Sequence, residues 1–363
     1  MAEADDTRAW LILLRVPGLG PARLRALLAE AGGEARAALR RVGHRQAMPD
    51  AARIEADLAW LATPGHRLLL YTDPDFPPQL EVIPQPPVAL FVAGDAGLLL
   101  RPQVAIVGAR NASAGGRANA RAFATALAAT GLLVTSGLAE GIDGVAHAAA
   151  LDAGAPTLAV MGTGPDVVYP RAHKALAARI AEHGALVSEF PPGVTALPEH
   201  FPRRNRLIAG LALGTLVIEA GMRSGSLITA RLAAEQGREV FALPGSIHNP
   251  LARGCHRLIR DGVRLVETVD EVVEALRPLA QALGAGLQAR LAEPAAGPAA
   301  ASGWQDDPAY RRLLKALGHD PTALDELAVR TELGPAALSS MLLMLELDGA
   351  VAGLPGGRYQ RLA

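Results

Sequence analysis

The sequence predicts an α/β protein with a Rossmann-like parallel sheet at its centre, and two observations support that prediction. Short apolar runs recur between residues 101 and 276, and glycine or a small polar residue follows each of them. Helical stretches separate these runs, and continuous apolar strands that alternate with helices indicate a parallel sheet covered on both faces. The predicted strands are 104–107, 132–134, 157–160, 216–218 and 240–243.

Four segments are predicted along the chain. Residues 1–65 form an N-terminal helical domain, because apolar residues recur at helical spacing on either side of a tight turn at 16–21. Residues 66–276 form the Rossmann-like domain together with its proline-rich lead-in. Residues 277–303 are dominated by Ala, Gly and Pro, which predicts a linker. Residues 304–363 place three helices before a two-stranded tail, which predicts a winged-helix domain.

Composition narrows the class of protein. The chain has 363 residues, a formal net charge of −1 and 4% aromatic residues, so binding to nucleic acid requires a local basic patch rather than bulk charge. A single cysteine, Cys255, excludes an internal disulfide framework and a cysteine-based zinc site. The acidic start lacks the features of a signal peptide, and no apolar run reaches about 18 uninterrupted residues. We therefore expect a cytoplasmic protein without a membrane span.

Ligands of open parallel sheets bind beyond the carboxyl ends of the strands, so the loops after the predicted strands form the candidate site. The first loop places Arg110 before the next helix, without the G-x-G-x-x-G pattern of dinucleotide-binding proteins. The second loop brings Ser136 and Gly137, and the third brings Gly162, all small enough for a ligand to approach the backbone closely. Plain strand-to-helix turns are the alternative interpretation of each loop.

Asp143 and His147 follow the second loop and share one face of a helix. Asp143 is also suited to capping that helix, and no Ser or Cys nucleophile accompanies the pair at a recognisable spacing, which favours a structural role. The sequence shows no cluster of metal-ligating residues. We therefore expect no catalytic residue, no metal and no cofactor.

The segment 199–208 is the most informative. Arg204 and Arg206, with Asn205 between them, precede an apolar helical pattern and are expected in the first turn of that helix. Cations at this end oppose the helix dipole, whereas an anionic ligand is attracted by the dipole and the arginines together. Phe201 stands just before them, and an aromatic ring beside arginines is suited to stacking unpaired bases. The alternative places Phe201 in the core and the arginines on a solvated face.

The loop after the strand at 216–218 opens another helix with Arg223, Ser224, Gly225 and Ser226. Either serine can cap that helix, and consecutive backbone N–H groups there can form an anion-binding nest. The loop lacks the lysine of a Walker A motif, so strong binding of a triphosphate is not expected.

Four motifs follow one another along the predicted Rossmann-like domain. They are Val107-Gly108-Ala109-Arg110, the run from Ser136 to His147, Phe201-Pro202-x-Arg204-Asn205-Arg206-x-Ile208-Ala209-Gly210, and Glu219-Ala220 followed by 224–230. Together and in this order they resemble the DprA family, also called DNA processing protein A or Smf. The resemblance covers residues 68–276 strongly, and both ends are similar as well. The turn at 17–20 looks like the helix-hairpin-helix or SAM-like element at the start of many members, and the last module looks like their optional winged helix.

The resemblance implies a bacterial cytosolic protein of natural transformation that is not an enzyme. Members of the family bind incoming single-stranded DNA, protect it and load the recombinase RecA onto it, usually as homodimers. The family's DNA contacts carry over to Arg110, Phe201 and the run Arg204-Asn205-Arg206. The first motif has Ala109 where many members have serine, which removes one hydroxyl. Further predicted DNA-binding positions are Ser136, Gly137, Gly162, Arg223, Ser224, Gly225 and Ser226.

Two other functions stay open from the sequence. Gly214, Thr215 and Glu219 faintly resemble the Gly-Thr…Glu arrangement of Rossmann-like phosphoribohydrolases, which would make the chain a nucleotide-processing enzyme, although their preceding Pro-Gly-Gly is missing. A DNA-binding regulator would use the winged helix instead. The expected recognition helix at 336–346 offers no Arg or Lys to base edges, so we expect the terminal module to bind protein or pack internally.

Overall fold

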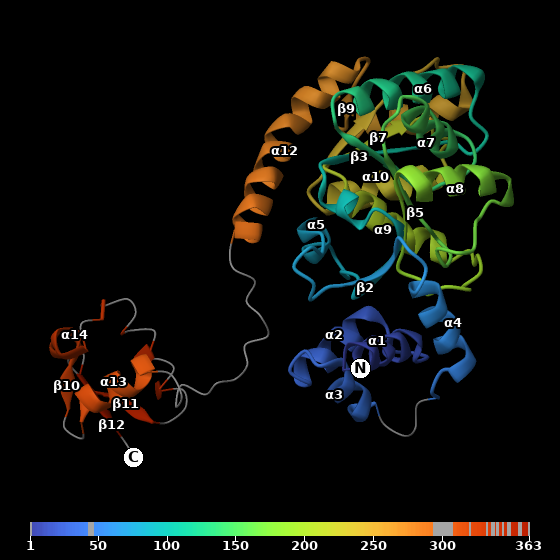
Figure 1. Cartoon of the computed structure of the whole chain (residues 1–363). Coiled ribbons are helices and arrows are strands. Elements are labelled where there is room, and N and C mark those ends of the chain that lie inside the picture. Colours follow the sequence, from blue (N-terminus) through green and yellow to red (C-terminus); the bar gives the residue numbers. More distant parts are fainter. Residues whose placement is uncertain are drawn as a thin grey trace. The chain divides into compact units, whose positions relative to one another are not determined.

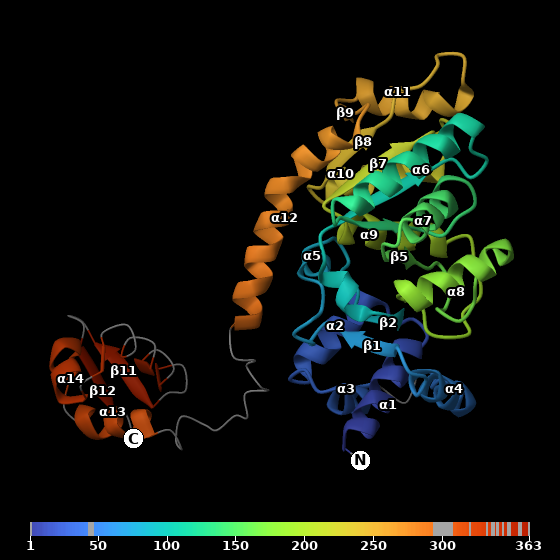
Figure 2. The same cartoon turned by 45° about the horizontal axis from the view of Figure 1, so that its top comes forward.

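The computed structural model describes residues 2–42, 47–292, 308–318, 321–331, 333–334, 338, 341–342, 345–346, 350–354 and 358–361. The chain divides into two compact units, Met1–Ala292 and Glu293–Ala363. The elements of both units are drawn in Figures 1 and 2.

A nine-stranded sheet forms the centre of the first unit, in the order β1-β2-β6-β5-β4-β3-β7-β8-β9. Seven neighbouring strands pair in parallel, namely β6, β5, β4, β3, β7, β8 and β9. Strands β1 and β2 extend the β6 edge of the sheet with antiparallel pairing. The five predicted apolar runs correspond to β3, β4, β5, β7 and β8. The strands are β1 His66–Leu70, β2 Ala89–Gly94, β3 Gln103–Gly108, β4 Leu133–Ser136, β5 Thr157–Val160, β6 Ala185–Ser188, β7 Gly214–Ile218, β8 Glu239–Ala242 and β9 Arg264–Leu265.

Helices cover both faces of this sheet, because the central strands are apolar on both sides (Figure 1). On β3, Val104 and Ile106 belong to the core under α6, α7 and α12, whereas Ala105 and Val107 belong to the core under α5, α9, α10 and α11. The helices are α5 Pro78–Glu81, α6 Ala114–Ala129, α7 Ile142–Asp152, α8 Lys174–His183, α9 His200–Leu211, α10 Gly225–Glu235, α11 Arg253–Arg260 and α12 Val269–Ala292, with 3-10 turns η1 Ala96–Leu100, η2 Arg171–His173 and η3 Pro250–Ala252.

Four helices precede the sheet, namely α1 Ala2–Arg15, α2 Pro21–Glu30, α3 Ala35–Arg41 and α4 Ala51–Leu61. The turn between α1 and α2 contains Gly18 at a φ of 77°, a conformation that glycine adopts without strain. The buried Asp57 of α4 accepts a hydrogen bond from Arg15 Nε at 2.5 Å, and Arg15 Nη2 donates to the carbonyl of Pro192 at 2.6 Å. These bonds tie the helices to the loop that leads into α9.

The predicted linker at 277–303 is wrong in its first part, because α12 continues to Ala292. Alanine and leucine are strong helix formers, and Ala280 and Leu283 pack against the core under α6. Pro278 lies inside this helix. Residues 293–303 lie outside the described residues.

The second unit contains α13 Pro308–Leu317, β10 Thr322–Ala323, α14 Leu324–Thr331, β11 Val351–Leu354 and β12 Arg358–Arg361. Its strands pair antiparallel in the order β10-β12-β11. Leu313, Leu327, Leu342 and Val351 form a core of their own. Most of the expected recognition helix at 336–346 lies outside the described residues.

Candidate nucleic-acid interface

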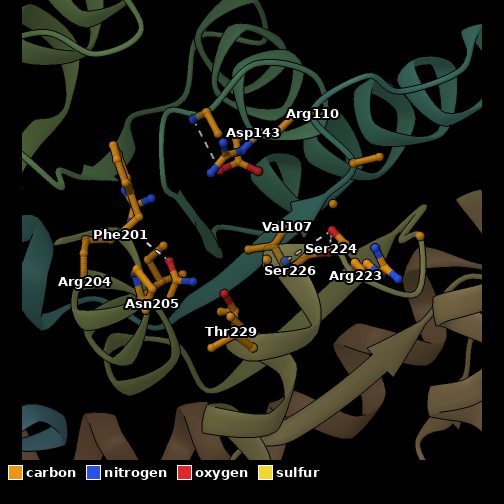
Figure 3. A pocket seen from close by; sticks show the side chains of 18 of the residues that line it. Val107, Arg110, Asp143, Phe201, Arg204, Asn205, Arg223, Ser224, Ser226 and Thr229 are labelled. Atoms are coloured by element: carbon orange, nitrogen blue, oxygen red, sulfur yellow. Dashed lines mark hydrogen bonds between the residues drawn. The ribbon is translucent and has the colours of Figure 1, made fainter. Parts of the chain in front are cut away.

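A cavity of about 730 Å³ opens at the carboxyl ends of the central strands. Strand β3 pairs with β4 on one side and with β7 on the other, and open α/β sheets bind ligands at such a switch in strand order. The cavity wall combines the loops after β3, β4, β5 and β7 with one side of α9. Figure 3 shows Phe201, Arg204 and Asn205 on one side of this cavity and Arg223, Ser224 and Ser226 on another.

Arg110 and Phe201 lie beside each other at the cavity. The guanidinium carbon of Arg110 is 5.9 Å from the centroid of the Phe201 ring, within the range of a cation–π contact. Arg110 is exposed and Phe201 is partly exposed, and both line the cavity. The structure therefore places an exposed cation next to an accessible ring, which is the combination that binds a phosphate together with an unpaired base.

Gly162 does not line the cavity but supports the Phe201 ring. A Cβ atom on Gly162 would lie 2.9 Å from Cδ1 and 3.1 Å from Cε1 of that ring. Any larger residue would force the ring to move. Gly162 was predicted to contact a ligand. In the structure it instead leaves the space that the Phe201 ring needs.

Arg204 lines the cavity while its head group is held by the protein. It is 5% exposed, and its Nη1 donates to the carbonyl of Gly137 at 2.7 Å and to the carbonyl of Val160. Its Nε donates to Oδ1 of Asn205, which also lines the cavity. Burial lowers the pKa of Arg204 to about 10, and Asp143 counteracts this shift. The guanidinium remains charged near neutral pH and adds positive potential below the ligand site.

Gly137 and Asp143 complete the support of Arg204. A Cβ atom on Gly137 would lie 2.6 Å from Nη2 of Arg204, so glycine leaves the space that the guanidinium occupies. Asp143 accepts hydrogen bonds from the backbone N–H groups of Gly137 at 3.1 Å and Ala139 at 3.4 Å. Burial raises the pKa of Asp143, and the charge of Arg204 opposes that rise. Asp143 thus fixes the loop after β4.

The expected position of the arginines at the start of α9 needs correction. The helix begins at His200, so Arg204 and Arg206 lie beyond its first turn, where the dipole effect has largely decayed. Arg206 is 6% exposed, does not line the cavity, and donates to Oε2 of Glu189 at 2.5 Å. Arg203 donates to the same oxygen at 3.0 Å. Glu189 lies 14 residues before Arg203 and 17 before Arg206, so its carboxylate falls outside the segment 199–208 on which the sequence prediction was based.

The N-terminus of α10 forms the opposite wall of the cavity. Ser224 caps this helix, because its Oγ accepts the N–H of Ser226 at 3.3 Å. Ser224, Gly225 and Ser226 line the cavity together with the exposed Arg223. The positive end of a helix dipole and an arginine therefore lie at the same edge, which suits a phosphate.

Four predicted positions, namely Ser136, Gly137, Gly162 and Arg206, do not line the main cavity. Ser136 is fully buried, and its hydroxyl donates to the carbonyl of Ile106, whereas Arg206 is turned to Glu189. Among the lining residues that the sequence prediction did not include is Tyr169, which belongs to the loop after β5. An aromatic residue that follows a strand end in a chain with 4% aromatics was the signal for it.

Glu219 disfavours the phosphoribohydrolase interpretation. Its carboxylate accepts from Ser113 N at 2.8 Å, Ser113 Oγ at 2.5 Å and Asn249 Nδ2 at 3.0 Å, and it does not line the cavity. Thr215 is fully buried within β7. Glu219 also fills the space that a side chain at Gly116 would need. The N-terminus of α6, the usual phosphate site after the first strand of such folds, thus already holds an internal carboxylate.

Asp143 and His147 do not contact each other through a hydrogen bond. Asp143 binds backbone N–H groups, whereas Nδ1 of the buried His147 contacts Oγ1 of Thr157 at 2.8 Å. In the part of the chain that the structure describes, no group of three or more His, Cys, Asp or Glu side chains could hold a metal ion. No helix among the described residues is long and apolar enough to cross a membrane.

The fold and the cavity define a Rossmann-like α/β protein with a cationic, partly aromatic site at the switch in strand order. The model of DNA recombination-mediator protein A matches residues 67–277, and that of the DprA winged helix domain matches residues 293–357. The chain belongs to the DNA recombination-mediator protein A family, DprA. The predicted family, Rossmann-like sheet and winged helix are thereby confirmed.

Known proteins that are similar to this chain include one relative compared by sequence and two solved structures. Protein Smf of Escherichia coli is 45% identical over 312 residues, which cover 85% of this chain and 81% of that protein. The crystal structure of DNA processing protein A from Streptococcus pneumoniae matches with a TM-score of 0.65 and 37% identity, over 74% of this chain and 97% of that one. DNA processing protein A from Helicobacter pylori, described for its single-stranded DNA binding mode, matches with a TM-score of 0.54 and 26% identity, over 59% and 96%.

Proposed function

We propose that this chain is a cytosolic protein that binds single-stranded DNA in the cavity at the carboxyl ends of the strands, without a catalytic step of its own. A strand would place phosphates at Arg110, at Arg223 and at the N-terminus of α10, and a base on Phe201. The relationship to a protein described for single-stranded DNA binding supports this proposal.

The observation that carries the proposal is the pairing of the exposed Arg110 with the accessible ring of Phe201. Stacking does not read base edges, so it tolerates every base. A duplex keeps its bases stacked inside and cannot offer one to a ring. The site therefore favours single strands, with weak sequence preference.

A polymer suits this site better than a mononucleotide. The cavity extends from Phe201 on α9 to Arg223 and Ser224 at α10, so its cationic groups lie on separate walls (Figure 3). Glu219 holds the N-terminus of α6, where a nucleotide phosphate would otherwise bind. Several separate phosphate sites match a strand that runs across the cavity.

The test is the affinity for a fluorescent 35-base strand and for its duplex. Arg110→Ala should weaken binding to the single strand at least about tenfold, because hydrogen bonds to charged groups contribute roughly 1.5–3 kcal/mol. Phe201→Ala should lose about 1–3 kcal/mol. The slope of log K against log salt should become less steep by about 0.7 in Arg110→Ala, since one phosphate contact is lost.

The matched control is Arg121→Ala, which removes an exposed arginine of α6 that does not line the cavity. This variant should bind single-stranded DNA as the wild type does. Equal losses in Arg110→Ala and Arg121→Ala would show attraction to general surface charge. Unchanged binding in Arg110→Ala and Phe201→Ala would contradict the proposed site.

We further propose that the protein protects incoming DNA in natural transformation and homologous recombination, loads RecA onto it and acts as a homodimer. Membership of the DprA family supports this role. Light scattering should give twice the chain mass in solution. RecA should form filaments faster on single strands that carry this protein, measured by the rate of DNA-dependent ATP hydrolysis. A monomeric mass would contradict the proposed homodimer. An unchanged rate of ATP hydrolysis would contradict the proposed loading of RecA.

A further inference from the structure

We propose that Tyr169 is a second stacking platform, which binds a base next to the one on Phe201. This inference rests on the proposed binding of single-stranded DNA and names a further residue of the same site. Tyr169 stands in the loop between β5 and α8, whereas Phe201 belongs to α9. Two separate segments thus contribute rings to one surface.

The position of Tyr169 is unusual for a large aromatic residue. Its side chain lines the main cavity and also a smaller one of about 80 Å³, which Arg110 and Phe201 line as well. Yet Tyr169 is 48% exposed, and it belongs to none of the buried clusters of the described residues. The Tyr169 hydroxyl has no hydrogen-bond partner in the described part of the chain. Neither core packing nor a hydrogen bond of the hydroxyl accounts for this ring.

The ring geometry decides where a base can lie. The centroids of Tyr169 and Phe201 are 5.4 Å apart, and the rings are tilted by 44°. Stacked bases are separated by about 3.4 Å, so a base between two rings would need roughly 7 Å. The two rings are too close for that arrangement. A base must therefore stack on the exposed face of Tyr169, while Phe201 supports the ring from the other direction.

Arg110 indicates which part of a strand reaches Tyr169. Arg110 lines both the main cavity and the small cavity, and the small cavity is also lined by the buried Arg204 and the exposed Glu140. A phosphate is attracted to the exposed Arg110. With a phosphate held there, the uncharged base next to it is the part of the strand that lies at Tyr169.

The experiment compares a 35-base thymidine strand with a strand of the same length whose sugars carry no bases. In the full chain, Tyr169→Leu keeps an apolar side chain but removes the ring, and it should bind the thymidine strand roughly 5- to 150-fold more weakly. On the abasic strand, this variant and the wild type should bind equally. Tyr169→Phe should keep wild-type affinity for both strands, because stacking does not need the hydroxyl.

Leu197→Ala is the matched control, because Leu197 is 44% exposed but lines neither cavity. It should bind both strands as the wild type does. Unchanged binding of Tyr169→Leu to thymidine, or an equal loss on both strands, would overturn the stacking role. A wild type that binds neither strand would overturn the proposed function itself, which separates the two failures.

Discussion

Replacing Arg204 by alanine should lower the free energy of unfolding by roughly 3–5 kcal/mol, because two hydrogen bonds from a charged donor disappear, each contributing about 1.5–3 kcal/mol. The carbonyls of Gly137 and Val160 would lose these bonds in a buried place, and Asp143 would lose its neighbouring cation. Equilibrium urea unfolding measures the effect. The loops after β4 and β5 would lose their common anchor.

Arg203→Ala provides the comparison for this prediction. Arg203 precedes Arg204 in the same helix, is 43% exposed and pairs with Glu189. The side chain of Glu189 is buried but keeps its ion pair with Arg206 when the exposed Arg203 is removed, so this variant should lose only about 0–1 kcal/mol and remain close to the wild type. Equal stability of the two variants would refute the anchoring role of Arg204. Weak DNA binding by Arg204→Ala alone would therefore not identify Arg204 as a DNA contact, whereas Arg110→Ala tests the site more directly.

Acid should destabilise the protein through His147. Thr157 Oγ1 donates to the carbonyl of Val134 at 2.7 Å, so Nδ1 of His147 must carry the proton that bonds this hydroxyl. Its Nε2 is buried without a hydrogen-bond partner among the described residues. Burial lowers the pKa of His147 from 6.5 to about 3, and the positive charges of His173 and Arg204 add to that shift. A second proton therefore has no favourable place in the folded state.

The sign of the pH effect follows from that shift. The unfolded chain takes up a proton near pH 6.5, whereas the folded chain does so only near pH 3. The free energy of unfolding should thus fall by about 1.4 kcal/mol for each pH unit between these values from this group alone. His147→Asn keeps an N–H donor for Thr157 but does not titrate. Urea unfolding from pH 7 to pH 4 should show a shallower slope in this variant, and equal slopes would refute the prediction.

The sequence was sufficient to predict the centre of the sheet. Each of the five apolar runs is a strand, because a strand buried on both faces needs apolar residues at every position. The same pattern predicted where the cavity lies, because the carboxyl ends of parallel strands meet at one edge of the sheet. Strand β6 at Ala185–Ser188 was missed, and its short run, Ala-Leu-Val-Ser, is weaker than the others. The helix at 277–292 was missed because its Ala and Gly content also suits a linker.

The partners of the charged residues were beyond local inspection. Arg206 pairs with Glu189 of the preceding loop, and Arg204 binds carbonyls at the carboxyl ends of two different strands. Such bonds depend on the tertiary arrangement, whereas sequence shows only spacing along one helix. The same limit applies to Gly162, whose role depends on a ring about 40 residues later in the chain.

The contact between Gly162 and Phe201 also constrains how this family can diversify. The ring occupies the space of the missing side chain, so a side chain at Gly162 would displace the ring. We therefore expect a relative with alanine at the first position to carry a smaller residue at the second. A larger residue at Gly162 alone would displace the aromatic ring, and a smaller residue at Phe201 alone would leave a gap beside Gly162. The pair should therefore behave as one inherited unit, visible as coupled substitutions between lineages.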